Sequence, residues 1–271
     1  MIIDNSQMKT FQACPFQYYE RYVRGIELDW LKKGATAAEF GTRMHQLLEM
    51  HYRDLQGNPI PPYPEFPLEG IELEAQLTMA AYLNHYPVEP FTVLDVEKTF
   101  RVPLTDRHEY VGKFDVILRD NETGMLSIMD HKTEKRRGQN NNPKAWAARS
   151  QGTLYLWAAP QVYEGEFRDL IVNVLTRQSD KGQEPPSFPE RQRIQRSPEQ
   201  MNLAVKGLVR IADQIEFAKE NWTEEDWAAA ANRNECMQGN YSCEFYEPHL
   251  YGWSEELVQL NYRKTEPYLD L

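Results

Sequence analysis

The sequence lacks long apolar runs and paired cysteines. No stretch approaches the roughly 20 apolar residues that a membrane helix needs. The N-terminus has neither a basic start nor an apolar segment, so we expect no signal peptide. Three cysteines are an odd number, which argues against a disulfide framework. We therefore expect an intracellular, cytoplasmic protein that has no membrane partner.

Basic residues are scarce relative to acidic ones. Lys and Arg total 30 against 41 Asp and Glu, giving a net charge of −11. This balance disfavours non-specific binding to DNA or anionic membranes but is compatible with a local basic groove. Hydrophobic residues make up 41% of the chain, with 15 Tyr and 6 Trp, which excludes collagen-like, low-complexity and disordered classes.

Apolar periodicity predicts an α/β chain. The turn residues 121–124 predict a hairpin between two strands. Ser6 is expected to cap the first helix, and Pro15 should split that helix near Cys14. Expected helices cover residues 6–24, 36–55, 71–86, 143–159, 197–219 and 223–231; expected strands cover 91–102, 110–118, 125–131 and 170–176; a Pro-rich loop covers 58–67.

These elements predict one domain over residues 1–271. Its core, about 91–176, would run helix, three mostly antiparallel strands, helix and strand. Helical additions would occupy about 1–90 and 195–271, ending in an irregular tail that contains cysteines. No internal repeat is found.

Charged residues inside two apolar strands indicate a metal site. Asp130 and Lys132 should share one face of their strand, with His131 on the other. The hairpin would bring Asp115 next to them, so that two carboxylates meet one ammonium. Carboxylates suit Mg²⁺, and a lysine can orient water or offset phosphate charge, which predicts metal-assisted phosphodiester hydrolysis. The plain alternative is a surface ion pair worth ~0–1 kcal/mol.

Three more polar residues fit this site. Gln151 and Tyr155 lie four residues apart and so share a helix face; alone they would be a stray amide and a core tyrosine. His45 is predicted on the second helix. A lone helical histidine is usually structural, but near two carboxylates it can complete a metal shell.

Five short motifs follow one another along the chain. They are Gly41-x-x-x-His45, Glu97 in a strand, Gly112-x-x-Asp115, Asp130-x-Lys132 and Gln151-x-x-x-Tyr155. In this order they resemble the PD-(D/E)XK nucleases. The similarity covers about residues 6–250 and is greatest to the RecB-type branch, which includes CRISPR-adaptation exonucleases and phage-borne nucleases. It implies a restriction-endonuclease-like fold and a bacterial or phage origin.

The resemblance implies a DNA exonuclease that depends on Mg²⁺ or Mn²⁺. It would act on single strands or duplex ends in recombination, repair or phage DNA processing, with a helicase or recombinase as a candidate partner. The alternatives are a non-catalytic DNA-binding or assembly subunit and a hydrolase of another phosphoester. The implied roles are catalysis for Asp115, Asp130 and Lys132, a further metal ligand in His45, DNA contact or lysine positioning for Gln151 and Tyr155, and an ancillary acid in Glu97.

A basic segment follows the third strand. Residues 131–150 carry six basic and one acidic side chain, a local charge of +5. Such a run is more often a solvated loop, but its place after the Asp-x-Lys strand predicts phosphate contacts. The candidate DNA-binding residues here are Lys135, Arg136 and Arg137.

The cysteines offer a second metal site. RecB-type relatives often carry a 4Fe–4S cluster held by one N-terminal and three C-terminal cysteines, and Cys14, Cys236 and Cys243 resemble that layout. The fourth ligand position falls on His249, and the gap between Cys236 and Cys243 is longer than in the CRISPR-linked members. Three cysteines and a histidine could hold an iron–sulfur cluster or zinc. Free, buried cysteines are the alternative.

Overall fold

The computed structural model describes residues 1–29, 37–60, 62, 65, 69–135, 148–177, 185–238 and 241–265, without the side chains of 37, 135, 238, 241 and 255. The chain folds into two units, each made of separate segments. The first contains Met1–Gly34, Pro103–Gly112 and Val205–Leu271, and the second contains Ala35–Val102 and Lys113–Ala204. The prediction of one domain therefore stays a prediction.

A mixed sheet runs through the second unit. Its strands are β3 (Phe91–Pro103), β4 (Glu109–Asp120), β5 (Leu126–Lys135), β6 (Phe167–Arg177) and β7 (Gln192–Ile194). β3 pairs with β4, and the order continues β4-β5-β6-β7. The β4–β5 pair is antiparallel, as the hairpin predicted, whereas β5 and β6 are parallel. The predicted α/β core is confirmed, and the antiparallel strand β7 extends it.

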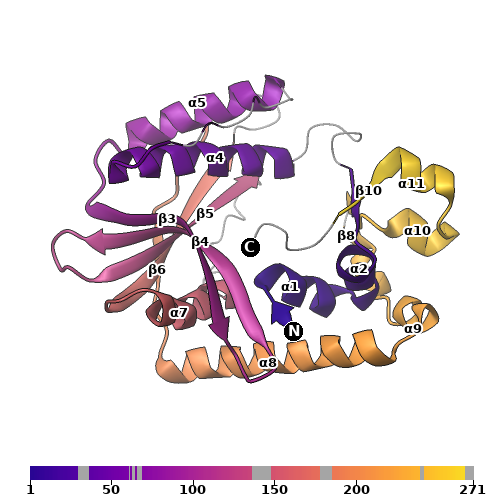
Figure 1. The fold of residues 1–271 in the computed structure, drawn as a ribbon. Helices are drawn as coiled ribbons and strands as arrows, with labels where there is room; N and C mark the ends of the chain where they lie inside the picture. Colours follow the sequence, from indigo (N-terminus) through magenta and orange to yellow (C-terminus); the bar gives the residue numbers. More distant parts are fainter. Residues whose placement is uncertain are drawn as a thin grey trace. The chain divides into compact units, whose positions relative to one another are not determined.

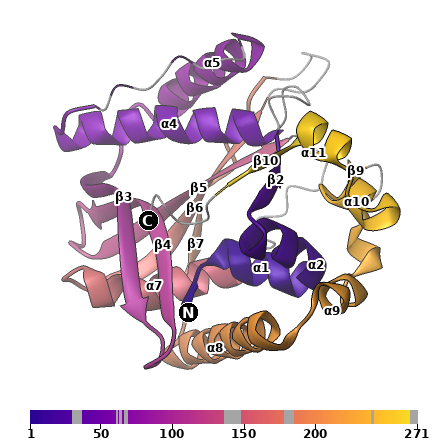
Figure 2. The same ribbon diagram turned by 45° about the vertical axis from the view of Figure 1, so that its right-hand side comes forward.

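Helices cover both faces of this sheet. Figures 1 and 2 show α4 (Ala37–Gln56) and α5 (Glu69–His85) side by side on one face and α7 (Ser150–Val162) on the other. An apolar stripe at every fourth residue directs α4 to the sheet, where it packs against β4, β5 and β6. The stripe consists of Phe40, Met44, Leu48 and Tyr52.

Two boundaries in this unit differ from the prediction. Strand β5 continues to Lys135 instead of ending at His131, because the parallel neighbour β6 pairs with it along its whole length. Lys132 therefore lies within the sheet. The helix expected from Pro143 begins at Ser150 in the part of the chain that the structure describes, and Pro143 itself falls outside it.

The first unit begins with a short strand and a split helix. β1 (Ile2–Ile3) pairs with the start of β4. α1 (Asn5–Ala13) is capped by Asp4, whose carboxylate accepts a hydrogen bond from the Gln7 amide at 2.7 Å, so the predicted cap Ser6 is wrong. Cys14 is extended because Pro15 follows it, which ends α1 as predicted. After α2 (Pro15–Tyr18) the chain forms a π-helical turn, Tyr19–Val23.

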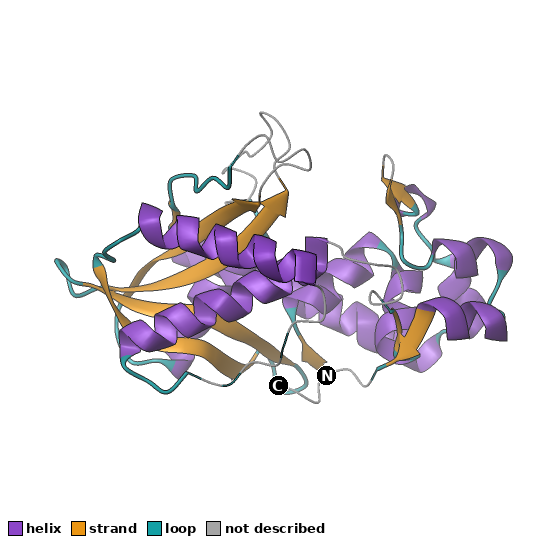
Figure 3. Cartoon of the chain, turned by 90° about the horizontal axis from the view of Figure 1, so that it is seen from above, coloured by secondary structure: helices purple, strands orange, loops and turns teal. Residues whose placement is uncertain are grey.

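The C-terminal segment is more ordered than expected. α8 (Pro198–Asn221) and α9 (Glu224–Ala229) match the prediction, but the expected irregular tail contains short helices and strands (Figure 3). The aromatic residues Phe16, Phe245 and Tyr262 pack around these pieces, which apolar periodicity alone does not reveal. The pieces are η3 (Arg233–Glu235), β8 (Met237–Gln238), β9 (Tyr241–Ser242), α10 (Tyr246–Tyr251), α11 (Glu255–Asn261) and β10 (Tyr262–Lys264), which pairs with β2 (Ile26–Leu28). Within the described ranges, no helix has the length and apolar character to cross a bilayer.

Candidate metal centre

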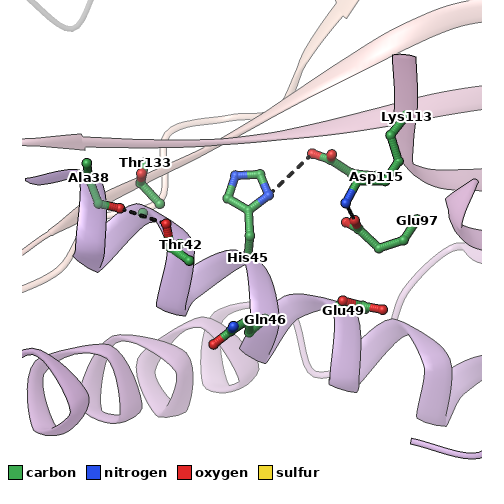
Figure 4. A pocket seen from close by; sticks show the side chains of 10 residues that line it. Ala38, Thr42, His45, Gln46, Glu49, Glu97, Lys113, Asp115 and Thr133 are labelled. Atoms are coloured by element: carbon green, nitrogen blue, oxygen red, sulfur yellow. Dashed lines mark hydrogen bonds and ion pairs between the residues drawn. The ribbon is translucent and has the colours of Figure 1, made fainter. Parts of the chain in front are cut away.

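The second unit contains a polar pocket between α4 and strands β3, β4 and β5 (Figure 4). Its volume is about 580 Å³. Three of its side chains carry carboxylates, and one carries an imidazole. The lining residues are Ala38, Gly41, Thr42, His45, Gln46, Glu49, Glu97, Lys113, Asp115 and Thr133.

Three potential ligands converge in this pocket. Ligand atoms of His45, Glu97 and Asp115 all lie within 4.8 Å of one another. Figure 4 shows the His45 ring facing the Asp115 carboxylate, with 3.8 Å between Nδ1 and the nearer oxygen. Carboxylates are ligands that Mg²⁺ and Mn²⁺ accept, and the imidazole adds a nitrogen ligand that suits Mn²⁺ better than the harder Mg²⁺. The side chains therefore fit the divalent cation that the sequence predicted.

Electrostatics in the pocket favour a bound cation. Burial, with Asp130 nearby, raises the pKa of Asp115 from 3.8 to about 7. Burial also raises the pKa of Glu97. The pKa of His45 is lowered, mainly by burial and then by Lys132, so its ring is neutral at neutral pH and can bind a metal. Carboxyl pKa values rise where burial and neighbouring carboxylates disfavour the ionised form, and a bound cation would offset that charge.

Glu97 has an unusual backbone. Its φ of 54° lies in the left-handed region, and among the described residues it is alone in this respect apart from glycines. Such strain costs ~1–3 kcal/mol and is found most often at functional sites. The side chain is 12% exposed and forms an ion pair with Lys113. The fold thus retains a strained residue where its carboxylate enters the pocket.

Asp130 and Lys132 form a tight pair next to this group. The Lys132 ammonium lies 2.9 and 2.8 Å from the two carboxylate oxygens of Asp130, which is buried. Asp130 does not belong to the set of ligand atoms within 4.8 Å. The Asp115 carboxylate accepts a hydrogen bond at 2.7 Å from the backbone amide of His131, the residue that follows Asp130. The Asp115 carboxylate therefore contacts the peptide group that joins Asp130 to His131.

His131 lies on the opposite face of β5, as alternation predicts, and is buried. Its ring stacks on Tyr52 of α4, with centroids 5.2 Å apart, and its Nδ1 is 2.9 Å from the Asn173 amide nitrogen. Burial lowers the pKa of His131 well below its usual value. His131, the unspecified position of the Asp130-x-Lys132 motif, thus connects the sheet to the helix that carries His45.

A buried polar network continues from there. The Tyr52 and Tyr82 hydroxyls are 2.8 Å apart, and Tyr52 donates to Glu89 at 2.9 Å. Arg191 binds both carboxylate oxygens of Glu89, at 2.6 and 2.7 Å, and donates to Tyr82 at 2.8 Å. Asn173 also donates to Tyr82, at 3.0 Å. The network ties α4 and α5 to β6 and to the residues before β3 and β7.

The predicted DNA-contacting residues are only partly described. The Gln151 amide donates to the Tyr155 hydroxyl at 3.1 Å, so the two do share one face of α7. The Tyr155 ring packs edge-on against Phe114 and Phe100, with centroids 5.2 and 5.7 Å apart. The side chain of Lys135 and residues Arg136 and Arg137 lie outside the described part of the chain.

Sequence reasoning did not assign Glu49, Lys113 and Thr133 to the site. Glu49 follows His45 by four residues on α4, and Lys113 precedes Asp115 by two on β4, so helix and strand periodicities could have found both. Gly41 has a steric role: a Cβ there would lie 3.0 Å from the Thr133 hydroxyl. Glycine thus lets α4 approach β5 closely.

The cysteines lie in the first unit. Cys236 Sγ is 3.4 Å from His249 Nδ1, and Cys14 Sγ accepts a hydrogen bond from the Asn232 amide at 3.3 Å. Burial raises the pKa of the Cys236 thiol and raises that of Cys243 to about 11. In the described ranges these residues do not form a set of ligand atoms within 4.8 Å of one another. The iron–sulfur or zinc site stays a prediction.

Comparison with known proteins identifies relatives. The sequence profile of the PD-(D/E)XK nuclease superfamily matches residues 5–247. The crystal structure of a candidate exonuclease from Eubacterium rectale is similar, with a TM-score of 0.50 and 13% identity over 82% of each chain, a likeness of fold alone. A second solved structure, SSO0001, has 15% identity and a TM-score of 0.33, covers 69% of this chain and 77% of its own, and carries no argument. No curated protein matches.

Proposed function

The chain belongs to the PD-(D/E)XK nuclease superfamily, and we propose that it is a deoxyribonuclease that depends on Mg²⁺ or Mn²⁺ and acts on DNA ends. The observation that carries this proposal is the group of His45, Glu97 and Asp115 beside the Asp130–Lys132 pair. Acids that can hold a metal ion, with a lysine beside them that can stabilise developing negative charge, suit the hydrolysis of a phosphodiester.

In this proposal His45, Asp115 and Asp130 hold the cation, and Glu97 is an ancillary ligand. The bound cation would polarise the phosphodiester and lower the pKa of the attacking water. Lys132 donates hydrogen bonds to that water or to a phosphate oxygen, from the position that its contact with Asp130 gives it. The neutral imidazole of His45 offers a lone pair without competing for a proton at neutral pH.

DNA would be bound beside the centre. Gln151, Tyr155, Lys135, Arg136 and Arg137 are the proposed contacts, of which the basic ones neutralise phosphates and the other two orient the strand or Lys132. The local charge of +5 over residues 131–150 supports this placement in a chain of net charge −11. A helicase or recombinase that delivers the DNA belongs to the same proposal.

The experiment is a cleavage assay on linear, nicked and circular DNA, labelled at the ends where ends exist, with Mg²⁺, Mn²⁺ or EDTA. We expect mononucleotides or short fragments from linear DNA, no loss of covalently closed circles, and no cleavage in EDTA. Cleavage of closed circles would show that the protein is an endonuclease and not an exonuclease. DNA binding without strand breakage in any metal would support the non-catalytic subunit instead.

We also propose that Cys14, Cys236, Cys243 and His249 hold an iron–sulfur cluster or zinc in the first unit. The 3.4 Å contact between Cys236 and His249 supports a shared ligand set. Its role would be structural, because it would join the N-terminal helices to the C-terminal segment.

A further inference from the structure

Lys113 lies in the acidic pocket. Among the described residues that line the pocket, Lys113 supplies the ammonium group, and Glu49, Glu97 and Asp115 supply the carboxylates. Its ammonium forms an ion pair with Glu97 (Figure 4). The lysine side chain is 47% exposed, whereas that of Glu97 is 12% exposed. A half-exposed ammonium thus meets a largely buried carboxylate.

The positive charge of Lys113 partly offsets the negative charge of the pocket carboxylates. Three carboxylates near one another repel, and an ammonium among them lowers that cost. A divalent cation bound by the same acids would remove the need for the ammonium and repel it at close range. Lysine suits such an exchange, because its flexible four-carbon stem can carry the ammonium into solvent.

Building on the proposed metal centre, we propose that Lys113 is an internal counter-ion that competes with the divalent cation for Glu97 and, once displaced, binds a DNA phosphate. Metal binding would then release a positive charge at the mouth of the pocket, where the substrate arrives. Lys113 would couple the two events: without metal it masks the acids, and with metal it contributes to DNA affinity.

The alternative role for Lys113 is a permanent strut that holds Glu97 in its strained conformation. The two roles predict opposite effects on metal binding. If Lys113 competes, removing its charge strengthens metal binding; if it holds Glu97 in place, removing it weakens metal binding.

The test measures Mn²⁺ dissociation constants by electron paramagnetic resonance, without DNA. The variant Lys113→Met keeps most of the stem and loses the charge. Arg119→Met is the control, because Arg119 is an exposed cation on the same strand, outside the pocket. We expect Lys113→Met to bind Mn²⁺ about two- to fivefold more tightly, the scale of one exposed ion pair, and Arg119→Met to match the wild type. An unchanged or weaker affinity in Lys113→Met would overturn the proposal.

A second experiment tests whether the displaced Lys113 ammonium binds a DNA phosphate. Binding of phosphorothioate DNA is measured against salt concentration with Mn²⁺ present. Lys113→Met should lower the slope of log affinity against log salt by about one, since one phosphate contact is lost. An unchanged slope would refute the DNA contact. If wild-type protein binds no Mn²⁺, or if Asp115→Asn binds it equally well, the proposed metal centre itself fails, whereas normal wild-type binding with no effect in Lys113→Met removes only this inference.

Discussion

At the scale of single residues, the backbone of Glu97 is the clearest sign of a constraint beyond folding. Left-handed φ costs an L-residue ~1–2 kcal/mol, and glycine avoids that cost. A chain selected for stability alone would gain by placing glycine or asparagine at this position of β3. That glutamate stands there instead is explained if its carboxylate serves the pocket.

The left-handed backbone at Glu97 predicts that glycine is more stable than alanine at this position, the reverse of the usual order in strands. Glu97→Gly should be more stable than Glu97→Ala by ~1 kcal/mol, although glycine normally weakens a strand. Urea unfolding of the two variants measures the difference. Both lack the carboxylate, so their Mn²⁺ affinities should fall equally. Greater stability of the alanine variant would mean that the φ of 54° carries no strain.

The raised pKa of Asp115 predicts how metal affinity depends on pH. The folded carboxyl titrates at about 7 and the unfolded one near 3.8, so the metal-free fold loses stability as pH rises through this range. Metal needs the ionised form, so around and below pH 7 protons compete with it, and Mn²⁺ affinity should fall about fivefold from pH 7 to pH 6. Titration by electron paramagnetic resonance at several pH values measures this. Asp115→Asn should show no such slope, and a flat wild-type profile would contradict the assignment.

The sequence could identify the acids but not their grouping. Strand alternation correctly placed Asp130 and Lys132 on one face and His131 on the other. Alternation does not say that the Asp115 carboxylate accepts a hydrogen bond from the His131 amide, or that Glu97 reaches the same pocket. Both depend on a local backbone conformation that pattern reasoning does not see.

At the scale of elements, the buried network fixes the helix that carries His45. Tyr52 lies two turns after His45 on α4 and contacts His131 on β5, so the helix and the Asp130 strand share one anchor. The buried ion pair of Arg191 and Glu89, whose side chains are 10 and 5% exposed, belongs to the same network. A charge buried in such a network is costly when its partner is removed.

Removing one partner of the Arg191–Glu89 ion pair should therefore destabilise the fold. Arg191→Met leaves a buried carboxylate without its main partner and should destabilise the fold by ~3–5 kcal/mol. The double variant Arg191→Met/Glu89→Gln should lose much less than the sum of the two single variants. A double-mutant cycle from urea unfolding measures the coupling. Additive effects would show that the pair is not a unit.

Element prediction succeeded where periodicity is long. The helices α4, α5 and α8 and the strands β3, β4 and β6 lie within a few residues of their predicted bounds. It failed for two- and three-residue strands: β2 and β10 are defined by pairing with each other across the chain, and β8 is too short to show a period. The extension of β5 depends on its partner β6, which no local pattern specifies.

At the scale of the whole molecule, the thiol site would join the two ends of the chain within the first unit. If it holds a cluster, anaerobically purified protein should be brown, absorb visible light and contain iron; if it holds zinc, elemental analysis should find about one zinc per chain. Cys14→Ser should release the metal and destabilise the first unit. Colourless, metal-free and fully folded protein would establish free thiols.

We propose that the acids of β4 and β5 and Lys132 form one hydrolytic centre. The most direct measurement is single-turnover cleavage of end-labelled linear DNA in Mg²⁺ by wild type, Asp130→Asn and Lys132→Met, with circular dichroism as the check on folding. We expect both variants to fold and their cleavage rates to fall at least about 100-fold, the scale of losing one electrostatic or general-acid–base group. Wild-type rates in both variants would contradict it.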